Sequence, residues 1–415
     1  MVAGGARAVA RCDAFGVAPF SDMVDGLFRA WLTPAFAAAQ DQLAAWMEDA
    51  GMGVSHDGAT NVIGRYEGQN PDAPALLIGS HIDSVADGGR YDGPLGVMLG
   101  VELVAALHTA GRRMPFAIEI IAFGDEEGSR FPAAMLTSRA VAGTLKLDAL
   151  EIVDAAGVEL ADALRQGGYD PGAFRLATRA PGSVLAYLEA HIEQGPVLEA
   201  QGLAVGVVTG IAAQHRYMVR LTGQAGHAGT CAMPLRRDAL AGAAEMVLAV
   251  EKLARDDASD LVATVGQISA HPGAANVIAG DVRFSIDLRS GDPQRHAQAA
   301  QSMLDRLAAI AAARDLGFTA TRTFELPASP CDPALMALLD TALAQAGQPP
   351  MRLVSGAGHD AIAMAALCPT AMLFIRCRGG ISHNPAEHVE ADDADVALRV
   401  MLHFIELLGA SLEHS

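Results

Sequence analysis

Short apolar runs, each followed by a polar loop that contains glycine, mark the N-terminal third of the chain and a segment near its C-terminus. The runs at 75–79, 116–123 and 371–375 have the length and composition of buried strands. Residues 96–110 carry Leu and Val on one helical face, and 393–408 form a second helical pattern. The order strand, helix, strand predicts a sheet with crossover connections, which is an α/β architecture.

The middle of the chain has a different pattern, in which apolar and polar residues alternate along several segments. The predicted elements are, in order, a strand at 217–223, a helix at 235–253, strands at 261–268 and 281–289, a helix at 293–313 and a strand at 318–324. This β-α-β-β-α-β order is that of a split βαβ sandwich. We therefore expect an inserted α+β domain at 213–326 and a discontinuous main domain formed by 1–212 and 327–415.

Composition excludes several classes of function. A chain of 415 residues, with 51% apolar and 19% charged residues, is expected to be a globular protein of two domains. Its net charge of −19 argues against nucleic acid and against an anionic membrane surface as partners. An anionic small substrate stays possible, because the local charge of a cleft can oppose the global sign.

The termini and cysteines indicate a cytoplasmic protein. The first residues lack the basic start and apolar run of a signal peptide, and no stretch approaches the ~20 apolar residues of a membrane span. Five widely spaced cysteines fit neither a disulfide framework nor a CxxC zinc motif. Any metal would therefore be held by histidines and carboxylates.

The densest group of reactive side chains lies in the glycine-rich loop 79–93, which contains His81, Asp83 and Asp92. This loop follows a predicted strand, and open α/β sheets bind ligands at the carboxyl edge. Imidazole and carboxylate suit zinc or manganese. A polar loop with a surface histidine is an equally good interpretation of this segment alone.

Three other segments that lie beside apparent strand ends contain residues of the same kinds. Glu126 and Glu127 are adjacent, so one can bind a metal while the other acts as a general base towards water. His191 and His383 each lie beside a predicted strand. An exposed acidic turn and structural histidines are the alternatives for each segment alone, but the recurrence at four strand ends favours a metal site.

These segments also carry a family resemblance that covers nearly the whole chain. The motifs are GSHIDS, GGRYDGPLGV, FGDEEGSRF, HIEQGPVLE, GHAGT, RRDAL, NVI followed by FSIDLR, SGAGHDA and GGISHNPAE. On these motifs the chain resembles the amidase, hydantoinase and carbamoylase branch of the M20 metallopeptidase superfamily. The resemblance implies a mixed-sheet α/β catalytic domain with helices on both faces, and an inserted lid and dimerisation domain.

The resemblance also implies a dinuclear metal site. Asp92 is expected to bridge two divalent ions, zinc or manganese in the first place, with cobalt or nickel as further candidates. The other implied ligands are His81 and His191 for one ion, and Glu127 and His383 for the other. By the same resemblance, Glu126 is the general base and Asp83 orients His81.

The implied substrate contacts lie mainly in the inserted domain. By the resemblance, His227 is expected to polarise the scissile carbonyl from the second subunit of a homodimer, and Asn276 and Arg289 to hold a substrate carboxylate. Gln194 and the backbone of Gly358 complete the pocket. The fork of Arg289 suits a carboxylate by itself, although a salt bridge at the domain rim is the alternative.

Within the family, the segments 123–132, 225–230 and 374–387 are most similar to allantoate amidohydrolases. We favour hydrolysis of a ureido C–N bond of allantoate, with N-carbamoyl-L-amino acids as the main alternative and ureidoglycine-type and β-ureidopropionate substrates behind them. An M20-type dipeptidase or aminopeptidase is a more distant alternative. A non-catalytic binding protein would have lost a ligand or the base, and all are present.

The remaining histidines receive no catalytic role. His215, His271 and His359 stay ambiguous, because they lie in or near the motifs without an assigned function. The others are expected to be structural or surface residues, and they are His56, His108, His296, His388, His403 and His414.

Overall fold

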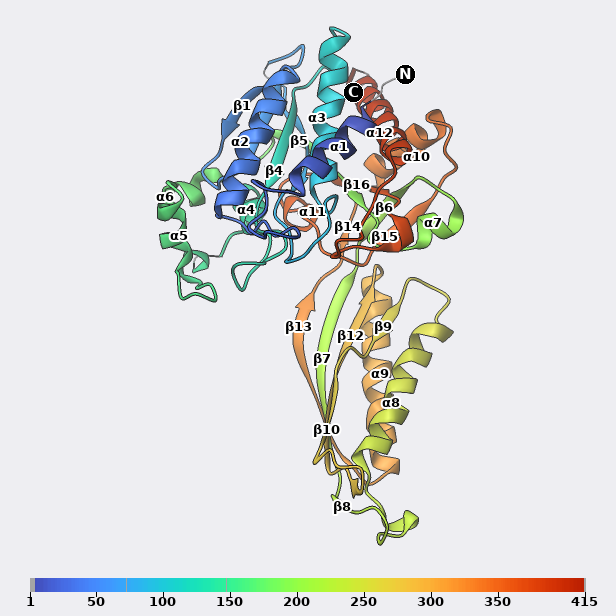
Figure 1. The fold of residues 1–415 in the computed structure, drawn as a ribbon. Coiled ribbons are helices and arrows are strands. Elements are labelled where there is room, and N and C mark those ends of the chain that lie inside the picture. Colours follow the sequence, from blue (N-terminus) through green and yellow to red (C-terminus); the bar gives the residue numbers. More distant parts are fainter. Residues whose placement is uncertain (1–3, 72, 147, 414–415) are drawn as a thin grey trace. The chain divides into compact units, whose positions relative to one another are not determined.

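The computed structural model describes residues 4–71, 73–146 and 148–413 (Figure 1). The chain divides into two compact units. The first unit comprises Met1–Thr209, Cys331–Leu353 and Ala357–Ser415, and the second comprises Gly210–Pro330 and Val354–Gly356. His414 lies outside the described residues. None of the helices formed by the described residues combines the length and the apolar character that a membrane crossing requires.

A mixed sheet organises the first unit, in the order β1-β2-β4-β3-β5-β16-β6-β14, with β15 also paired to β6. Its strands are β1 (Gly53–His56), β2 (Val62–Tyr66), β3 (Ala75–His81), β4 (Ile118–Phe123), β5 (Val184–Ile192), β6 (Val205–Ile211), β14 (Ser329–Pro330), β15 (Arg352–Ser355) and β16 (Thr370–Ile375). Of these, β14 and the last two residues of β6 and of β15 belong to the second unit. The four central strands, β4, β3, β5 and β16, are parallel to one another. Their carboxyl ends therefore meet at one edge of the sheet.

The apolar runs explain why these strands are central. Every residue of β3, β4 and β16 is buried, as expected for strands that are covered on both faces. Helix α3 (Pro94–Thr109) packs on β3 and β5, and α1 (Gly5–Phe15) and α12 (Ala391–Glu413) pack on α3. The α/β class predicted from the sequence is confirmed.

The remaining helices of the first unit are shorter or lie further from the central strands. The α-helices are α2 (Pro34–Asp49), α4 (Leu136–Val141), α5 (Leu160–Gln166), α6 (Pro171–Phe174), α7 (Val197–Gln201), α10 (Pro333–Gln345) and α11 (Ala361–Met364). The short 3-10 helices are η1 (Ala149–Glu151), η2 (Arg175–Ala177) and η4 (Arg378–Gly380).

The second unit is an antiparallel sheet of order β10-β12-β7-β13, with β9 also paired to β12. Helices α8 and α9 lie side by side on one face of this sheet (Figure 1). The elements are β7 (Ala213–Thr222), β8 (Gly226–His227), η3 (Met233–Leu235), α8 (Ala239–Asp256), β9 (Val262–Thr264), β10 (Ile268–His271), β11 (Val277–Ile278), β12 (Asp281–Ser290), α9 (Pro293–Ala313) and β13 (Gly317–Leu326).

Two elements of this unit differ from the sequence prediction. The helix expected from residue 235 begins at Ala239, because the Asp238 side chain caps it by accepting hydrogen bonds from two backbone N–H groups. The strand expected at 261–268 is interrupted, because the Ser285 side chain and the backbone of Gln267 bond to each other between β9 and β10. The sequence pattern contained no signal for the small β8–β11 pair.

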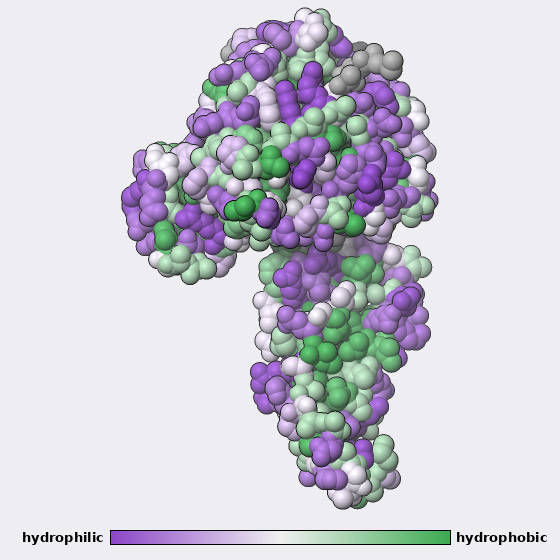
Figure 2. All heavy atoms as spheres, in the orientation of Figure 1, coloured by the Kyte–Doolittle hydropathy of each residue, from purple (hydrophilic) through white to green (hydrophobic). Residues whose placement is uncertain are grey.

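One face of α8 is apolar and exposed. Leu240, Ala244 and Leu248 follow one another at four-residue spacing, which places them in one stripe, and Leu248 is 64% exposed. Figure 2 shows hydrophobic residues gathered on the side of this unit that carries α8. A stripe of this kind is typical of a surface that another chain covers.

Close packing of α3 on β5 leads to a stability prediction. A Cβ atom at Gly96 would lie 2.0 Å from the backbone oxygen of Ala190, whereas one at Gly100 would first meet the Ile120 Cδ1 methyl group at 2.9 Å. Gly96→Ala is therefore expected to lower the free energy of unfolding by about 1–3 kcal/mol, measured by denaturant titration. Gly100→Ala is the matched control in the same helix, and an equal loss in both variants would contradict this account.

Candidate metal centre

The predicted reactive residues of the first unit come from the ends of four adjacent parallel strands. His81 ends β3, and Glu127 follows β4. His191 is the second-last residue of β5, and His383 lies in the segment after β16. Because these strands are neighbours in the order β4-β3-β5-β16, their side chains converge at the carboxyl edge of the sheet.

Asp92 lies at the centre of this convergence. Its Oδ1 is 3.1 Å from Nε2 of His191 and 3.7 Å from Nε2 of His81. Its Oδ2 is 3.2 Å from Nε2 of His383, and that nitrogen is 3.6 Å from Oε2 of Glu127. Two groups able to hold a metal ion result, and they share Asp92 through opposite oxygens.

Backbone carbonyls define which ring nitrogen faces this centre. Nδ1 of His191 lies 2.9 Å from the carbonyl oxygen of Ile192, and Nδ1 of His81 lies 3.1 Å from that of Asp83. Since a carbonyl only accepts, each Nδ1 carries a proton, and Nε2 is the ring nitrogen that faces Asp92. A protonated Nε2 donates to that carboxylate, and a deprotonated Nε2 offers its lone pair to a cation. This is the orientation that a metal-binding histidine needs.

The Asp83 carboxylate connects two of the strand ends. Its oxygens accept hydrogen bonds from the backbone N–H groups of Glu126 and Glu127, each at 3.2 Å. Its nearer oxygen is 3.6 Å from Nδ1 of His81, so its closest contact with that ring is through the backbone carbonyl. Asp83 thereby holds the acidic pair after β4 against the histidine that ends β3.

The electrostatics of the centre favour a bound cation. Burial raises the pKa of Glu126 well above its usual range and raises that of Glu127 to about 7. Burial acts in the same direction on Asp92, but hydrogen bonds with the surrounding histidines outweigh it and hold its pKa well below normal. Divalent cations would stabilise all three carboxylates in their charged form. The donor set therefore fits a metal centre.

Two residues in the segment after β16, which the sequence analysis did not assign to the site, hold the loop that contains Asp92. Oε1 of Glu387 accepts the backbone N–H groups of Tyr91, at 2.8 Å, and Asp92, at 3.1 Å. The hydroxyl of Ser382 donates to Oδ2 of Asp92 at 2.6 Å. Both residues belong to the GGISHNPAE motif, which was the available signal.

Arg29 supplies the loop with a buried cation. Its Nε donates to the carbonyl oxygen of Ile82 at 2.5 Å, and its backbone pairs with Ser84. Burial lowers the pKa of Arg29 to about 10, although Asp83 opposes the shift. Nothing in the local sequence distinguishes this arginine, because its role depends on residues more than fifty positions away.

Gln194 and Gly358 border the centre in the first unit. Nε2 of Gln194 donates to Oδ2 of Asp92 at 2.8 Å, while its buried Oε1 has no hydrogen-bond partner among the described residues. A Cβ atom at Gly358 would come within 3.8 Å of Oε1 of Glu126 and 3.3 Å of Met135 Cε. The space beside Glu126 thus depends on the absence of a side chain at residue 358.

The second unit places its predicted substrate contacts at opposite ends. His227 is paired with Val277 in the small β8–β11 sheet, and Ala228 donates its N–H to the carbonyl oxygen of Asn276. This sheet precedes the start of β12, whereas Arg289 is the second-last residue of β12 (Figure 1). Eight residues of strand, from 281 to 289, correspond to about 26 Å.

Arg289 is partly engaged inside its own unit. Its Nε and Nη2 bind the two oxygens of Asp287, at 2.7 and 3.0 Å, and its Nη1 donates to the carbonyl oxygen of Gly356 at 2.5 Å. Gln214 and Arg216 also donate to Asp287. A guanidinium has five N–H groups, so one remains on each terminal nitrogen of Arg289.

Comparison with known proteins adds independent information. The model of the peptidase family M20/M25/M40 matches residues 77–407. The chain belongs to this family. The N-carbamoyl-L-amino acid amidohydrolase of Geobacillus stearothermophilus is 43% identical over 92% of this chain and 93% of its own. The allantoate deiminase of Arabidopsis thaliana is 40% identical over 96% of this chain and 82% of its own.

Solved structures agree with these relatives. An amidase of the hydantoinase/carbamoylase family from Burkholderia multivorans has a TM-score of 0.89 and 36% identity, covering 97% of each chain. The resemblance inferred from the motifs is confirmed, and this M20 family member is a hydrolase that acts on C–N bonds.

Some histidines of this M20 hydrolase pack on other rings without facing Asp92 as the three above do. His359 is buried against His191, with ring centroids 4.4 Å apart at a steep angle. Burial lowers its pKa well below the usual value, so it packs as a neutral ring. In the second unit, His215 packs in the same manner on His296, at 4.3 Å. Both residues therefore make ring contacts inside their own units.

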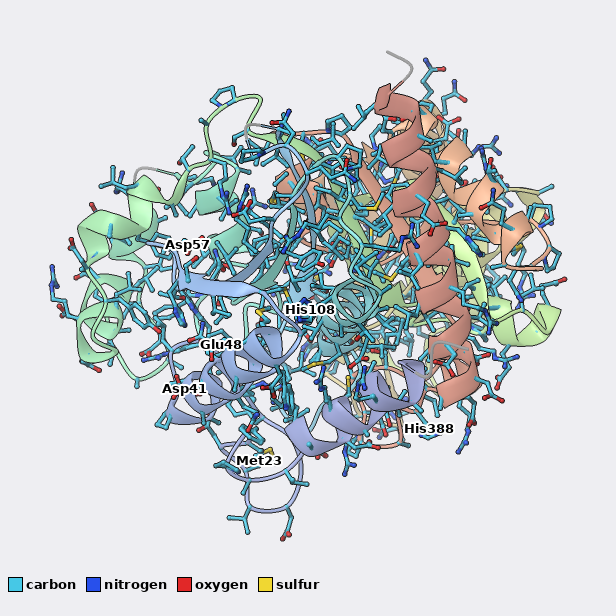
Figure 3. The ribbon with its side chains drawn as sticks, turned by 90° about the horizontal axis from the view of Figure 1, so that it is seen from above. Met23, Asp41, Glu48, Asp57, His108 and His388 are labelled. Atoms are coloured by element: carbon cyan, nitrogen blue, oxygen red, sulfur yellow. The ribbon has the colours of Figure 1, made fainter. Side chains whose placement is uncertain are left out.

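Two histidines that the sequence analysis left without a role are visible in Figure 3. His108, in the last turn of α3, meets the edge of Tyr66 with centroids 6.1 Å apart. His388 meets Tyr91 in a similar way, at 6.0 Å. Both therefore serve packing.

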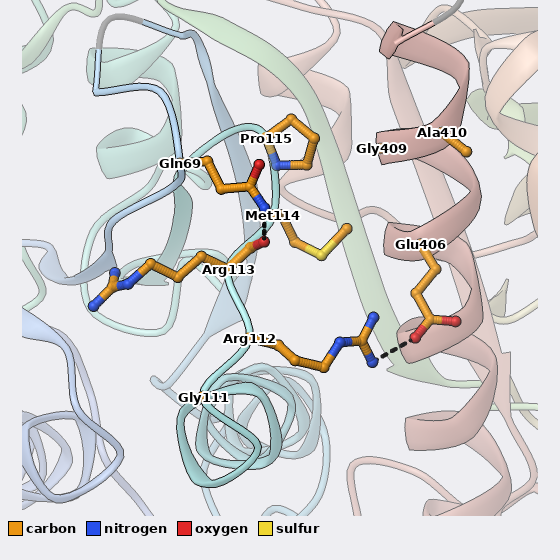
Figure 4. A pocket seen from close by; sticks show the side chains of 9 residues that line it. All are labelled: Gln69, Gly111, Arg112, Arg113, Met114, Pro115, Glu406, Gly409 and Ala410. Atoms are coloured by element: carbon orange, nitrogen blue, oxygen red, sulfur yellow. Dashed lines mark hydrogen bonds and ion pairs between the residues drawn. The ribbon is translucent and has the colours of Figure 1, made fainter.

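A pocket of about 420 Å³ in the first unit contains none of the predicted site residues. Gln69, Arg112 and Glu406 contribute to its lining, and Arg112 pairs with Glu406 at 2.8 Å (Figure 4). Pro115, which also lines it, precedes the start of β4, so this pocket lies at the amino end of that strand. It is separate from the carboxyl edge where Asp92 lies.

Removing Glu387 tests how the Asp92 loop is held. Glu387→Ala deletes the acceptor for two backbone N–H groups of the loop, so we expect divalent-metal affinity to fall by about 10- to 100-fold. Competition with a chromogenic chelator measures this change. Glu390→Ala is the control, because that exposed acid of the same segment pairs with Arg378 instead. A folded Glu387→Ala protein with wild-type metal affinity would refute the role.

Proposed function

We propose that this protein hydrolyses a ureido C–N bond of a small carboxylate substrate with the help of two divalent metal ions. The observation that carries this proposal is the position of Asp92, whose two oxygens face two separate groups of potential ligands. Glu126 approaches the same centre, with Oε2 4.0 Å from Nε2 of His81, but belongs to neither group.

The proposed ligands are those that the structure brings together. His81, His191 and Asp92 would hold one ion, and Asp92, Glu127 and His383 the other. Bound ions would supply Lewis-acid chemistry, which acidifies water and stabilises negative charge on a carbonyl oxygen. Imidazole and carboxylate ligands suit zinc and manganese first, and cobalt or nickel as well.

The other residues would divide the remaining tasks. Glu126, as general base, takes a proton from the attacking water and delivers it to the leaving nitrogen. The unpartnered Oε1 of Gln194 can accept an N–H of the substrate. The open space beside Gly358 would accommodate the reacting group near Glu126. Hydrolysis of a ureido group then yields ammonia, carbon dioxide and an amine.

Allantoate is the substrate that we propose. Its carboxylate suits the two free N–H groups of Arg289, and its ureido groups suit amide and carboxylate partners. N-carbamoyl-L-amino acids are the second candidate, because a relative that is 43% identical is an N-carbamoyl-L-amino acid amidohydrolase. Both candidates share a ureido group and a carboxylate, so the chemistry at Asp92 would be the same. β-Ureidopropionate and dipeptides are more distant possibilities.

The activity test uses allantoate, N-carbamoyl-L-amino acids, β-ureidopropionate and dipeptides, with zinc- and manganese-loaded protein. We expect ammonia release from allantoate and no cleavage of dipeptides. Glu126→Gln should lower kcat by about 10²- to 10⁴-fold, because the general base is lost, while the protein still binds two equivalents of metal. Full turnover by Glu126→Gln would overturn the mechanism, and dipeptide cleavage alone would indicate a peptidase.

We propose further that the complete site requires a homodimer. His227 and Asn276 lie about 26 Å of strand away from Arg289, which is more than a small substrate spans. One small substrate could contact both ends of this unit only if they come from two copies of the chain. The exposed apolar stripe of α8, formed by Leu240, Ala244 and Leu248, is a suitable contact surface between copies (Figure 2).

Complementation tests this arrangement. His227→Ala and Arg289→Ala should each be nearly inactive alone. A mixed dimer contains one site with both residues intact if they act across the interface, so unfolding and refolding an equimolar mixture should restore about a quarter of wild-type activity. Each variant refolded alone is the control. A mixture that gains nothing, although mixed dimers form, would show that the two residues act within one chain.

A further inference from the structure

The segment between β8 and α8 folds back on His227. The backbone N–H groups of Thr230 and Cys231 both approach the carbonyl oxygen of His227, at 3.3 Å. The N–H of Ala228 bonds to the carbonyl oxygen of Asn276 at 2.9 Å. Because the His227 side chain is exposed, packing does not orient its ring, and the conformation of the loop must do so.

A backbone group selects the tautomer of that ring. The N–H of Gly229 donates to Nδ1 of His227 at 3.0 Å. An Nδ1 atom that accepts a hydrogen bond carries no proton, so the neutral ring has its proton on Nε2. The Nε2–H of this exposed side chain is then available as a hydrogen-bond donor.

Arg236 fastens both ends of this turn. Its Nε donates to the carbonyl oxygen of Cys231 at 3.0 Å, and its Nη2 donates to that of Ala228 at 2.5 Å. The two carbonyls lie on either side of Gly229 in the chain. The Ala228 carbonyl belongs to the same peptide plane as the Gly229 N–H, and the Cys231 carbonyl lies just beyond it in the turn. By holding both carbonyls, the planar fork of Arg236 limits the position of the Gly229 donor.

We propose that Arg236 is a positioning residue that keeps His227 in the Nε2–H tautomer through the Gly229 turn, ready to donate a hydrogen bond to the substrate carbonyl oxygen. The role of the donor rests on the proposed function. The tautomer itself does not depend on the proposed function, because it follows from contacts within the second unit. A preorganised donor at a developing oxyanion contributes most when it needs no rearrangement during the reaction.

The neighbouring Arg237 provides a matched control. It lies in the same segment and is also partly buried, but its Nε bonds to the carbonyl oxygen of Asp315 at 2.6 Å and pairs with that residue's carboxylate. It therefore fastens the turn after α9, and within the described part of the chain its side-chain hydrogen bond and ion pair both go to Asp315. Replacing Arg236 and Arg237 one at a time separates positioning of the loop from a general loss of positive charge.

The first experiment is nitrogen NMR of protein labelled with ¹⁵N-histidine, at alkaline pH, with His227→Gln to assign the signal. Wild type and Arg237→Met should show His227 protonated on Nε2, and Arg236→Met should show a mixture of both tautomers. An unchanged His227 signal in Arg236→Met would overturn the proposal. This readout needs no turnover, so it remains decisive even if no ureido substrate is cleaved and the proposed function fails.

Kinetics provide the second readout. Arg236→Met should lower kcat by up to about 100-fold with a small change in KM, because the donor is misplaced in the transition state. Arg237→Met should retain wild-type kcat. Millimolar guanidinium should restore part of the activity of Arg236→Ala, which excludes global misfolding as the cause. A rise in KM alone would instead show that Arg236 contacts the substrate, and would refute the positioning role.

Discussion

Carboxylates that are buried together repel each other, and the contacts around Asp92 in the first unit counter that repulsion. The loops after β3 and β4 bring Asp92, Glu126 and Glu127 to one edge, where burial opposes their ionisation. Three histidine Nε2 atoms face Asp92, and they are oriented so that cations can lie between the acids. The backbone bonds to Asp83 and Glu387 hold the acids in place despite the repulsion.

The backbone around this centre is unusual for the same reason. Asp125, Gln194 and His383 have φ values of 62°, 55° and 55°, a left-handed conformation that costs non-glycine residues on the order of 1 kcal/mol or more. Asp125 and Gln194 lie in the turns that follow β4 and β5, and His383 is itself one of the residues that face Asp92. The turns direct side chains towards Asp92 that a regular strand would direct elsewhere, and the packed sheet supplies the stability to maintain them.

The two units contribute different kinds of interaction. The first unit brings charged side chains together at the buried carboxyl edge of its sheet, where the strength of each ion pair depends on small distances. The second supplies hydrogen-bond donors at its two ends, on a sheet and two helices that separate His227 from Arg289. Under the proposed function, reaction and recognition would therefore be located on separate scaffolds. The similar proteins include one named for N-carbamoyl-L-amino acids and one named for allantoate, and both of these substrates contain a ureido group.

The sequence by itself determined three of the four central strands, the α/β class and the segments that carry the reactive residues. The fourth strand, β5, was inferred only as an apparent strand end beside His191. Continuous apolar runs identify buried parallel strands, and ligands follow their carboxyl ends because every parallel strand ends at the same edge. The sequence alone was therefore enough to assign four residues to one site, namely His81, Glu127, His191 and His383. The edge strands β1 and β2, and the break between β9 and β10, were missed because short or interrupted pairing leaves little pattern.

Only the tertiary structure decided how these residues act on one another. Arg29, Glu387 and Arg236 have no local signal for their roles, because each bonds to backbone atoms whose position depends on the whole fold. The two oxygens of Asp92 became distinct only when four strand ends were brought within a few ångströms of each other. Residue types and their order are encoded locally, whereas hydrogen-bond directions and charge separations arise from contacts between distant segments.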